Sequence, residues 1–251
     1  MRSIDAPSPA ASARGLTKTY GSGDTTVRAL DGVDVDIAPG EFTAIMGPSG
    51  SGKSTLMHML AGLDRPTSGS VWLAGTEITA MRDKQVTLLR RRRVGFVFQG
   101  FNLLPMYTAR QNILLPFELA GKKPDAAWFD QLVGLLGLTD RLTHLPSELS
   151  GGQQQRVAIA RALITRPDVV FADEPTGNLD SRSGQQVLGF LRTSVRELGQ
   201  TVVMVTHDAV AAAHATRVLL LADGRIAGEI TDPTTDAITS GLDALRTDEV
   251  A

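Results

Sequence analysis

The chain has 251 residues, 42% of them hydrophobic and 21% charged, with a formal net charge of −2. A net charge this close to zero excludes a general attraction to nucleic acids or anionic lipids, and the absence of cysteine excludes disulfides and thiolate metal sites. No apolar run approaches the roughly 18 residues of a membrane span. The length suits one large domain, or two small lobes that share a core.

The first part of the chain has the pattern of short strands. Residues 1–13 are polar and rich in Ala, Ser and Pro, which predicts a disordered lead-in. "VDVDI" at 33–37 alternates apolar and acidic residues, which predicts a half-exposed strand with its valines and isoleucine inward. "FTAIM" at 42–46 is a continuous apolar run, suited to a strand buried on both faces. Further strands are expected at 70–75 and 94–99.

The pattern becomes helical over residues 105–165 and then returns to strands. We expect a helical lobe there, inserted between strands. "DVVFADE", "TVVMVTH" and "RVLLLADG" are the next apolar strands, and a helix over 181–198 separates the first two. This alternation predicts a parallel α/β core within a domain that spans 14–230. Residues 231–251 carry only a weak helical pattern and are expected to form a peripheral tail.

"GPSGSGKST" at 47–55 fits the phosphate-loop pattern, after a buried strand and before a helix. Glycines let successive backbone N–H groups converge on a phosphate, Lys53 offers a mobile cation, and the Ser54 hydroxyl is a ligand for Mg²⁺. A Gly/Ser-rich turn that matches by chance is the alternative, and the flanking strand and helix argue against it. We therefore expect phosphate contacts from Gly47, Pro48, Ser49, Gly50, Ser51, Gly52, Lys53, Ser54 and Thr55.

Two acids and a histidine follow buried strands. Asp173 and Glu174 end "VVFADE", and His207 ends "TVVMVTH". Because parallel strands bring their C-terminal ends to one edge of a sheet, we expect these side chains in the ligand crevice. Asp173 is then placed to assist Mg²⁺ binding, Glu174 to reach a water in line with the γ-phosphate, and His207 to bond that phosphate and orient the water. Gln99, which ends "VGFVFQ", offers a neutral donor or acceptor near metal and water, although alone it is typical of a surface residue.

A second glycine pair precedes a strongly helical stretch in "LSGGQQQRVAIARAL", residues 149–163. Flexible backbone before a helix N-terminus also builds an anion site, because the first N–H groups of the helix are unpaired. The sequence therefore predicts a second phosphate cradle in addition to the phosphate loop. Tyr20, in "LTKTYGSG", adds an aromatic ring that can stack on a purine.

These elements and their order closely resemble the ATP-binding subunit of an ABC transporter, from about residue 14 to residue 230. In this resemblance the A-loop, Walker A, Q-loop and H-loop fall on Tyr20, 47–55, Gln99 and His207. Walker B and its catalytic acid fall on 169–173 and Glu174, and the D-loop falls on "NLD", which adds Asp180 to the site. The ABC signature is the most specific of these motifs, and "LSGGQ" matches it with Leu149, Ser150, Gly151, Gly152 and Gln153.

The resemblance implies an α/β P-loop NTPase fold with a mixed-sheet catalytic core, an antiparallel β subdomain and an inserted helical lobe. It implies ATP and Mg²⁺ as cofactors, with Ser54, Gln99 and Asp173 at the metal. It implies ATP hydrolysis by Lys53, Gln99, Glu174 and His207. It also implies a homodimer in the ATP-bound state, in which each signature caps the γ-phosphate held by the Walker A motif of the other subunit. Such a dimer explains why one chain carries two cradles.

Two segments, "GFVFQGFNLLPMYTARQNILLPFELAG" and "DEPTGNLDSRSG", resemble the group of lipoprotein-release, macrolide-export, peptide-resistance and cell-division ATPases. This implies a peripheral protein at the cytoplasmic face of the cell membrane. Its partner would be an integral membrane subunit with an extracytoplasmic domain, and no nucleic acid is expected. The expected function is export, lipid or lipoprotein extraction, or peptide resistance. A signalling complex that controls an extracellular hydrolase is the alternative. A soluble ABC ATPase fits poorly, because the chain has one cassette and no long insertion between Walker A and signature.

The charged and histidine side chains outside these motifs allow less specific predictions. "RRRR" at 90–93 is expected to be a solvated helix face, and a contact with acidic groups of a membrane partner is the alternative. The remaining histidines are expected to be packing or surface residues; they are His58, His144 and His214.

Overall fold

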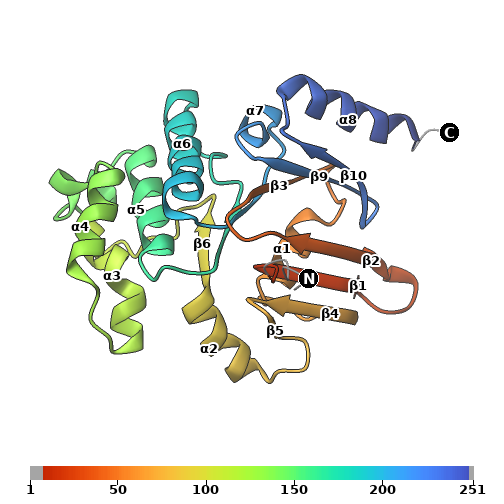
Figure 1. The fold of residues 1–251 in the computed structure, drawn as a ribbon, viewed down its shortest axis with the longest axis horizontal. Helices are drawn as coiled ribbons and strands as arrows, with labels where there is room; N and C mark the ends of the chain where they lie inside the picture. Colours follow the sequence, from red (N-terminus) through yellow and green to blue (C-terminus); the bar gives the residue numbers. More distant parts are fainter. Residues whose placement is uncertain (1–7, 249–251) are drawn as a thin grey trace, which may run out of the picture.

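A mixed six-stranded sheet forms the centre of the computed structural model, which describes residues 8–248. Its strand order is β10-β9-β3-β8-β7-β6, and all neighbours are parallel except β10 with β9. The strands are β3 (Phe42–Met46), β6 (Val94–Phe98), β7 (Val169–Asp173), β8 (Val202–Val205), β9 (Arg217–Ala222) and β10 (Arg225–Thr231). Because β3, β7 and β8 are parallel, their C-terminal ends lie at one edge of the sheet. Figure 1 labels β3, β6, β9 and β10 of this sheet.

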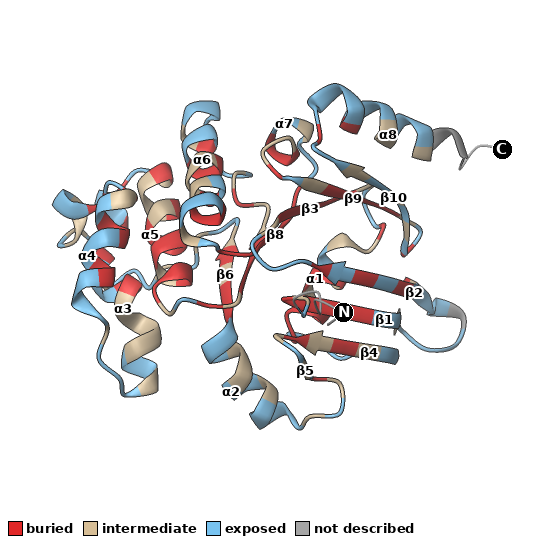
Figure 2. Ribbon diagram, in the orientation of Figure 1, coloured by how far each residue is buried: buried red, intermediate tan, exposed pale blue. Residues whose placement is uncertain are grey.

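The central strands are buried on both faces, because successive residues alternate between two hydrophobic cores. In β7, Val170 and Ala172 belong to one core and Val169 and Phe171 to the other. β3 and β8 alternate in the same way, and Figure 2 shows these central strands as almost continuously buried. The expectation from "FTAIM" is confirmed, since every residue of β3 is buried.

A second, antiparallel sheet lies beside the first, with the order β2-β1-β4-β5. Its strands are β1 (Ala11–Tyr20), β2 (Val27–Ile37), β4 (Ser68–Leu73) and β5 (Thr76–Glu77). Helix α1 (Lys53–Leu60) fills the space between the two sheets, and its apolar side chains share one core with both. The alternation predicted for "VDVDI" is confirmed, with the apolar residues buried and both aspartates exposed.

Helices cover the opposite face of the central sheet, and three of them form the inserted helical lobe (Figure 1). The lobe contains α3 (Ala109–Ala120), α4 (Ala126–Leu135) and α5 (Gly151–Leu163), within the range predicted for it. Helix α6 (Ser181–Leu198) packs beside α5, and α2 (Asp83–Arg93) runs directly into β6. The fold therefore matches the predicted mixed core, antiparallel subdomain and helical lobe.

Both ends of the predicted domain need correction. Residues 1–7 lie outside the described residues, but β1 already begins at Ala11, and Ala11 and Ala13 are fully buried. The lead-in predicted over 1–13 is therefore too long, because small apolar side chains at alternate positions pack under the sheet.

Similarly, the predicted tail over 231–251 contains helix α8 (Thr235–Asp248), which packs on β9, β10 and α7 (Ala209–Ala212). Ile238 anchors this helix, since its side chain is fully buried.

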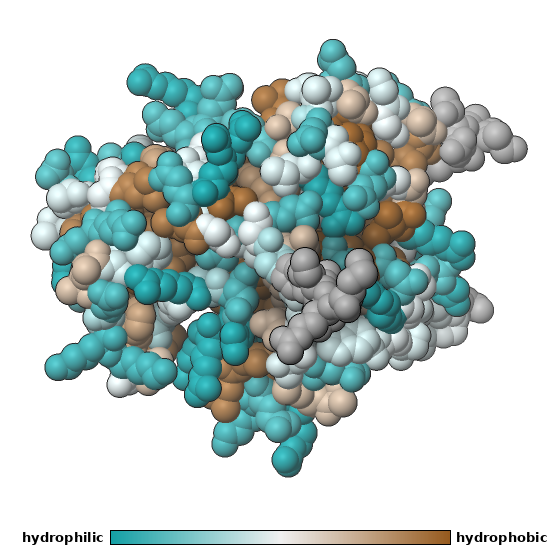
Figure 3. Space-filling view, in the orientation of Figure 1, coloured by the Kyte–Doolittle hydropathy of each residue, from teal (hydrophilic) through white to brown (hydrophobic). Residues whose placement is uncertain are grey.

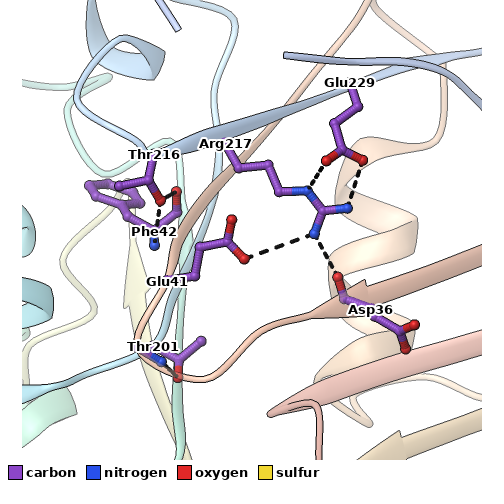
Figure 4. A network of polar contacts seen from close by, with 8 residues as sticks. Asp36, Glu41, Phe42, Thr201, Thr216, Arg217 and Glu229 are labelled. Carbon is purple, nitrogen blue, oxygen red and sulfur yellow. Dashed lines mark hydrogen bonds and ion pairs between the residues drawn. The ribbon is translucent and has the colours of Figure 1, made fainter. Parts of the chain in front are cut away.

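A polar network around Arg217 joins the two sheets at the edge that carries the N-terminal ends of the parallel strands (Figure 4). The guanidinium donates to both carboxylate oxygens of Glu229, each at 2.8 Å, and to the Asp36 carbonyl at 2.7 Å. Glu41 lies 3.9 Å from the same group, whose side chain is only 17% exposed. One arginine therefore connects β9 and β10 with the end of β2.

We expect Arg217→Ala to lower the free energy of unfolding by about 2 kcal/mol, because hydrogen bonds to charged groups contribute about 1.5–3 kcal/mol. Urea denaturation followed by circular dichroism measures this loss. Arg225→Ala is the matched control: Arg225 pairs with Asp31 but its side chain is 69% exposed, so its removal should cost less than about 1 kcal/mol. Equal losses in the two variants would contradict the assignment of Arg217 as a link between the sheets.

Candidate active site

The phosphate loop connects β3 to α1, and close packing of its backbone requires glycine. A Cβ atom on Gly47 would lie 1.9 Å from the Leu221 carbonyl oxygen, and one on Gly52 would lie 2.2 Å from that of Ala29. Gly52 is also the residue that precedes α1, and it has no side chain to cap the helix. The first N–H groups of α1 therefore lack a side-chain partner and face outward as an anion site.

Lys53 and Ser54 begin α1 directly behind this loop. The Lys53 ammonium donates to the carbonyls of Gly47 and Pro48, at 2.9 Å and 2.6 Å, so the side chain folds back over the loop. Partial burial lowers the pKa of Lys53, and the charge of Glu174 opposes this shift. The positive charge thus lies at the loop, where an anion would be bound.

Asp173 ends β7 beside Ser54. Burial raises the pKa of Asp173, and the nearby charge of Glu174 adds to this effect. The charge of His58 and a hydrogen bond with Ser54 act in the opposite direction. His58 lies one turn beyond Ser54 on α1, so the expectation that it only packs or faces solvent was incomplete. A partly buried carboxylate and a hydroxyl therefore share one place next to the loop.

Glu174 has an unusual backbone conformation for a residue with a side chain. Its φ is +45°, and its N–H donates to the Val205 carbonyl of the neighbouring strand at 2.9 Å. A non-glycine residue in the left-handed region costs about 1–3 kcal/mol and is found mainly where a site needs a side chain in an unusual position. Here the carboxylate oxygen Oε1 lies 2.9 Å from Nδ1 of His207, whose side chain is 77% exposed.

The phosphate loop, the start of α1, Glu174 and His207 line one pocket of about 430 Å³, whereas Asp173 is not part of its lining. This volume is within the range of about 300–1,000 Å³ usual for small-molecule sites. Its walls come from four places in the chain: β2, the phosphate loop with α1, the end of β7 and the end of β8. The lining contains Ala29, Gly47, Ser49, Gly50, Gly52, Lys53, Ser54, Thr55, Glu174, Val205 and His207. The structure thus brings together most of the phosphate loop with Glu174 and His207, as the sequence predicts.

Gln99 and Tyr20 do not line this pocket. The Gln99 amide donates to the Asn178 side chain at 3.2 Å, and the Asn178 amide donates back to the Gln99 carbonyl at 3.1 Å. Asn178 belongs to "NLD" but was not among the predicted site residues, and only the spatial contact identifies it. Tyr20 ends β1, is 43% exposed, and bonds to Asp64 through its hydroxyl.

The signature segment forms a second helix N-terminus, which also lies outside the pocket. Ser150 precedes α5 and its hydroxyl accepts from the Gln153 N–H at 3.3 Å, while the Gln153 side chain accepts from the Ser150 N–H at 2.8 Å. This capping box satisfies two backbone groups and leaves the N–H groups of Gly151 and Gly152 without a side-chain cap. A Cβ on Gly152 would lie 2.9 Å from the Ser183 hydroxyl, so this glycine is also required by packing against α6.

Asp180 caps the neighbouring helix α6. Its carboxylate accepts from the Ser183 N–H at 3.0 Å, and hydrogen bonds with Ser183 lower its pKa. Asp180 does not line the pocket, so its contact with the nucleotide stays a prediction. Sequence reasoning missed a further buried residue, Gln155, whose amide donates to the Pro175 carbonyl at 2.5 Å and to that of Phe98 at 3.4 Å. Gln155 links the signature helix to the segments that carry Gln99 and Glu174.

Comparison with known proteins agrees with this geometry. A family model described as "ABC transporter" matches residues 30–177. The macrolide export ATP-binding/permease protein MacB of Nitrosomonas europaea is 50% identical over 236 residues, which are 92% of this chain but 36% of that relative. The lipoprotein-releasing system ATP-binding protein LolD of Geobacter metallireducens is 48% identical over 216 residues, 85% of this chain and 96% of the relative. The chain thus spans about a third of the length of the MacB relatives it matches.

Solved structures of the ATP-binding cassette MJ0796 have the same fold. One is described as a dimeric post-hydrolysis state bound to ADP and Pi; it is 39% identical, with a TM-score of 0.79 over 89% of this chain and 99% of that chain. Another is described as the dimeric structure of a bacterial ABC transporter cassette, 40% identical, also with a TM-score of 0.79.

Proposed function

This chain belongs to the ABC transporter family of ATP-binding proteins and is an ATPase, and on that premise we propose that it dimerises around two ATP molecules and drives a membrane protein. The observation that carries the proposal is the separation of its two helix N-termini. The phosphate loop lines the pocket, whereas Ser150 to Gln153 do not. A second subunit, related by two-fold symmetry, can place its signature opposite the first subunit's phosphate loop and complete two equivalent sites.

The donors beside the loop fit Mg²⁺ carried by ATP. A hydroxyl on Ser54 and a partly buried carboxylate on Asp173 are hard oxygen ligands of the kind that Mg²⁺ prefers. Mg²⁺ is usually held by one or two protein oxygens together with substrate phosphates. When bound, it would neutralise charge on the β- and γ-phosphates. The Gln99 amide oxygen is a further ligand of this kind, because the bond to Asn178 uses only the amide nitrogen.

In the proposed hydrolysis, Glu174 accepts a proton from the attacking water while His207 holds the carboxylate in place and reaches the γ-phosphate. The 2.9 Å contact between Glu174 Oε1 and His207 Nδ1 supports this pairing. Lys53 releases the loop carbonyls and donates to the phosphates. The glycine-rich N-termini of α1 and of the second subunit's α5 hold the triphosphate from two sides.

A groove of about 470 Å³ lies on a different face of the chain and supports the proposal of a protein partner. It lies between α2, β6 and the helices α3 and α5, and the space-filling view in Figure 3 is hollowed between α2 and α3. Its lining is largely apolar and includes Arg90, Arg91 and Arg161 but no acidic residue. These arginines donate to backbone carbonyls (those of Gly62, Leu119, Phe101 and Asn102), so the groove keeps a net positive charge.

The arginine run at 90–93 is therefore not simply a solvated face, since Arg90 and Arg91 line the groove and Arg93 pairs with Asp168. We assign the groove to a cytoplasmic segment of an integral membrane subunit that presents apolar and acidic side chains. Relatives described as ATP-binding/permease proteins combine such an ATPase with a permease in one chain. Within residues 8–248, no helix is both long and apolar enough to cross a membrane. A partner of this kind would hold the chain as a peripheral subunit at the cytoplasmic face.

Site-specific photocrosslinking in cells tests this assignment. A photoreactive residue in place of Leu119, which lines the groove and is 64% exposed, should crosslink to an integral membrane protein with a large extracytoplasmic domain. The same residue in place of Ser240, exposed on α8, should not. Crosslinks from Leu119 to soluble proteins or ribosomes, identified by mass spectrometry, would overturn the proposal of a membrane partner.

Within this proposal, the resemblance to MacB and LolD favours export or lipoprotein extraction as the work done by the complex. The cell-division type of signalling complex is the alternative, in which the same ATP cycle controls an extracellular hydrolase. The crosslinked partner distinguishes export from signalling. Transport of a substrate by the partner and this chain in reconstituted vesicles supports export, and binding of a cell-wall hydrolase to the partner's extracytoplasmic domain supports signalling.

A further inference from the structure

Tyr20 is held in place by a charged pair that lies outside the predicted motifs. Its hydroxyl donates to Asp64 Oδ2 at 3.1 Å, and the Lys18 ammonium lies 2.8 Å from the same oxygen. The ammonium also lies 4.8 Å from the centre of the Tyr20 ring and donates to the Arg65 carbonyl at 2.7 Å. Lys18 therefore covers part of one face of the ring, and the ring as a whole remains 43% exposed.

The position of Asp64 is itself fixed by the backbone. Asp64 lies in the connection between α1 and β4, and its other oxygen, Oδ1, accepts from the Arg65 N–H at 2.7 Å. The same connection runs beside β1, with the Thr67 N–H donating to the Thr17 carbonyl at 2.8 Å. Burial tends to raise the pKa of Asp64, but the bonds from Lys18, Arg65 and Tyr20 outweigh it and keep the pKa below its usual value. The carboxylate is therefore ionised at neutral pH.

We propose that Asp64, together with Lys18, is a positioning residue that holds the Tyr20 ring ready to stack on the adenine of ATP. This inference rests on the proposed ATPase function and on the expectation, implied by the family resemblance, that Tyr20 stacks on adenine. An exposed ring at the end of a strand would otherwise be free to change its rotamer, and ordering such a side chain on binding costs affinity. Asp64 follows α1, whose N-terminus binds the phosphates in the proposed function. The bond from Tyr20 to Asp64 therefore fixes the ring relative to α1, so that the sites for the base and the phosphates are both ordered before ATP binds.

Two variants remove the tether and keep an aromatic ring. Tyr20→Phe deletes the hydroxyl, and Asp64→Ala deletes its acceptor. Each should weaken ATP binding by about two- to tenfold, which corresponds to the free-energy cost of immobilising one side chain on binding. Because both remove the same interaction, the double variant should bind ATP no more weakly than the weaker of the two. Asp64→Asn keeps an acceptor for the hydroxyl and should recover part of the loss. Fluorescence titration with an ATP analogue labelled on the ribose measures these affinities.

The controls separate positioning from a general structural effect. Asp83→Ala removes an exposed acid that pairs with Arg65 of the same connection but does not contact Tyr20, and it should bind ATP normally. Inorganic tripolyphosphate, which has no base, should compete equally well in every variant. The turnover rate at saturating ATP should not change. Weaker binding of tripolyphosphate to Asp64→Ala would mean that the whole site is disturbed, and it would overturn the inference.

Tyr20→Ala distinguishes this inference from the proposed function on which it rests. If Tyr20→Ala weakens ATP binding while Tyr20→Phe and Asp64→Ala bind as the wild type does, stacking stands and the tether is rejected. If Tyr20→Ala also binds as the wild type does, the ring is not the adenine platform and the inference fails, whereas the proposed ATPase function is unaffected.

Discussion

Glu174→Gln is expected to abolish ATP turnover and to accumulate an ATP-bound dimer. Glutamine has the shape of glutamate and still reaches His207, but it cannot accept a proton from the attacking water. Loss of a general base lowers a rate by about 10²–10⁴-fold. ATP binding should be retained, because the phosphate contacts come from the loop and from Lys53. Phosphate release measures the turnover, and size-exclusion chromatography with Mg-ATP measures the dimer.

A matched acid on the surface provides the control for this experiment. Glu197→Gln changes an exposed glutamate on α6, away from the pocket, and should hydrolyse ATP at the wild-type rate and show no accumulated dimer. The proposal would be wrong if Glu174→Gln bound Mg-ATP with wild-type affinity but eluted only as a monomer. Turnover close to the wild-type rate would likewise assign the proton acceptor to another group.

The parts of the fold that the sequence predicted are those governed by short-range pattern. Successive side chains of a strand point to opposite faces of the sheet. "VDVDI" alternates because only one face of its sheet is buried, and "FTAIM" is continuously apolar because both faces of its sheet are buried. The helix that begins at Gly151 was predicted from a glycine pair in front of a strongly helical stretch. A strand followed by Asp173 and Glu174 placed both acids at the sheet edge.

Contacts between segments far apart in the chain could not be predicted. Gln99 and Asn178 are 79 positions apart, and their mutual hydrogen bonds depend on how two loops meet after folding. The bond between Tyr20 and Asp64 spans 44 positions and depends on a connection that has no regular structure. The packing of helix α8 on the sheet was not predicted for a related reason. Its pattern is weak on its own, and the burial of Ile238 against β9 and β10 supplies what the local sequence does not.

The sequence motifs do not by themselves tell whether the signature contacts the ATP of its own chain or that of a second subunit. In the single chain, Ser150 to Gln153 do not line the pocket that contains the phosphate loop. On the shared-site proposal, the signature of a second subunit closes that pocket. Two inactive variants can decide this. Lys53→Ala removes the cation of the phosphate loop, and Ser150→Arg removes the helix cap and fills the signature with a large side chain.

Each variant alone is expected to be inactive as a homodimer, because both of its sites contain one damaged half. In a heterodimer with shared sites the damage is unequal. One site combines the Lys53→Ala loop with the Ser150→Arg signature, and the other combines an intact loop with an intact signature. Heterodimers isolated through two different tags should therefore trap labelled ATP at one site, although neither homodimer does so.

If each chain used its own signature, both sites of the heterodimer would contain one damaged half and mixing would restore nothing. Nucleotide trapping is the preferred measurement, because it reports closure of a single site even when hydrolysis needs two. A third variant, Ser240→Arg, places the same bulky cation on α8, and its heterodimer with Lys53→Ala should also trap ATP at one site. Isolated Lys53→Ala/Ser150→Arg heterodimers that trap no ATP, beside trapping by this control, would reject the shared site.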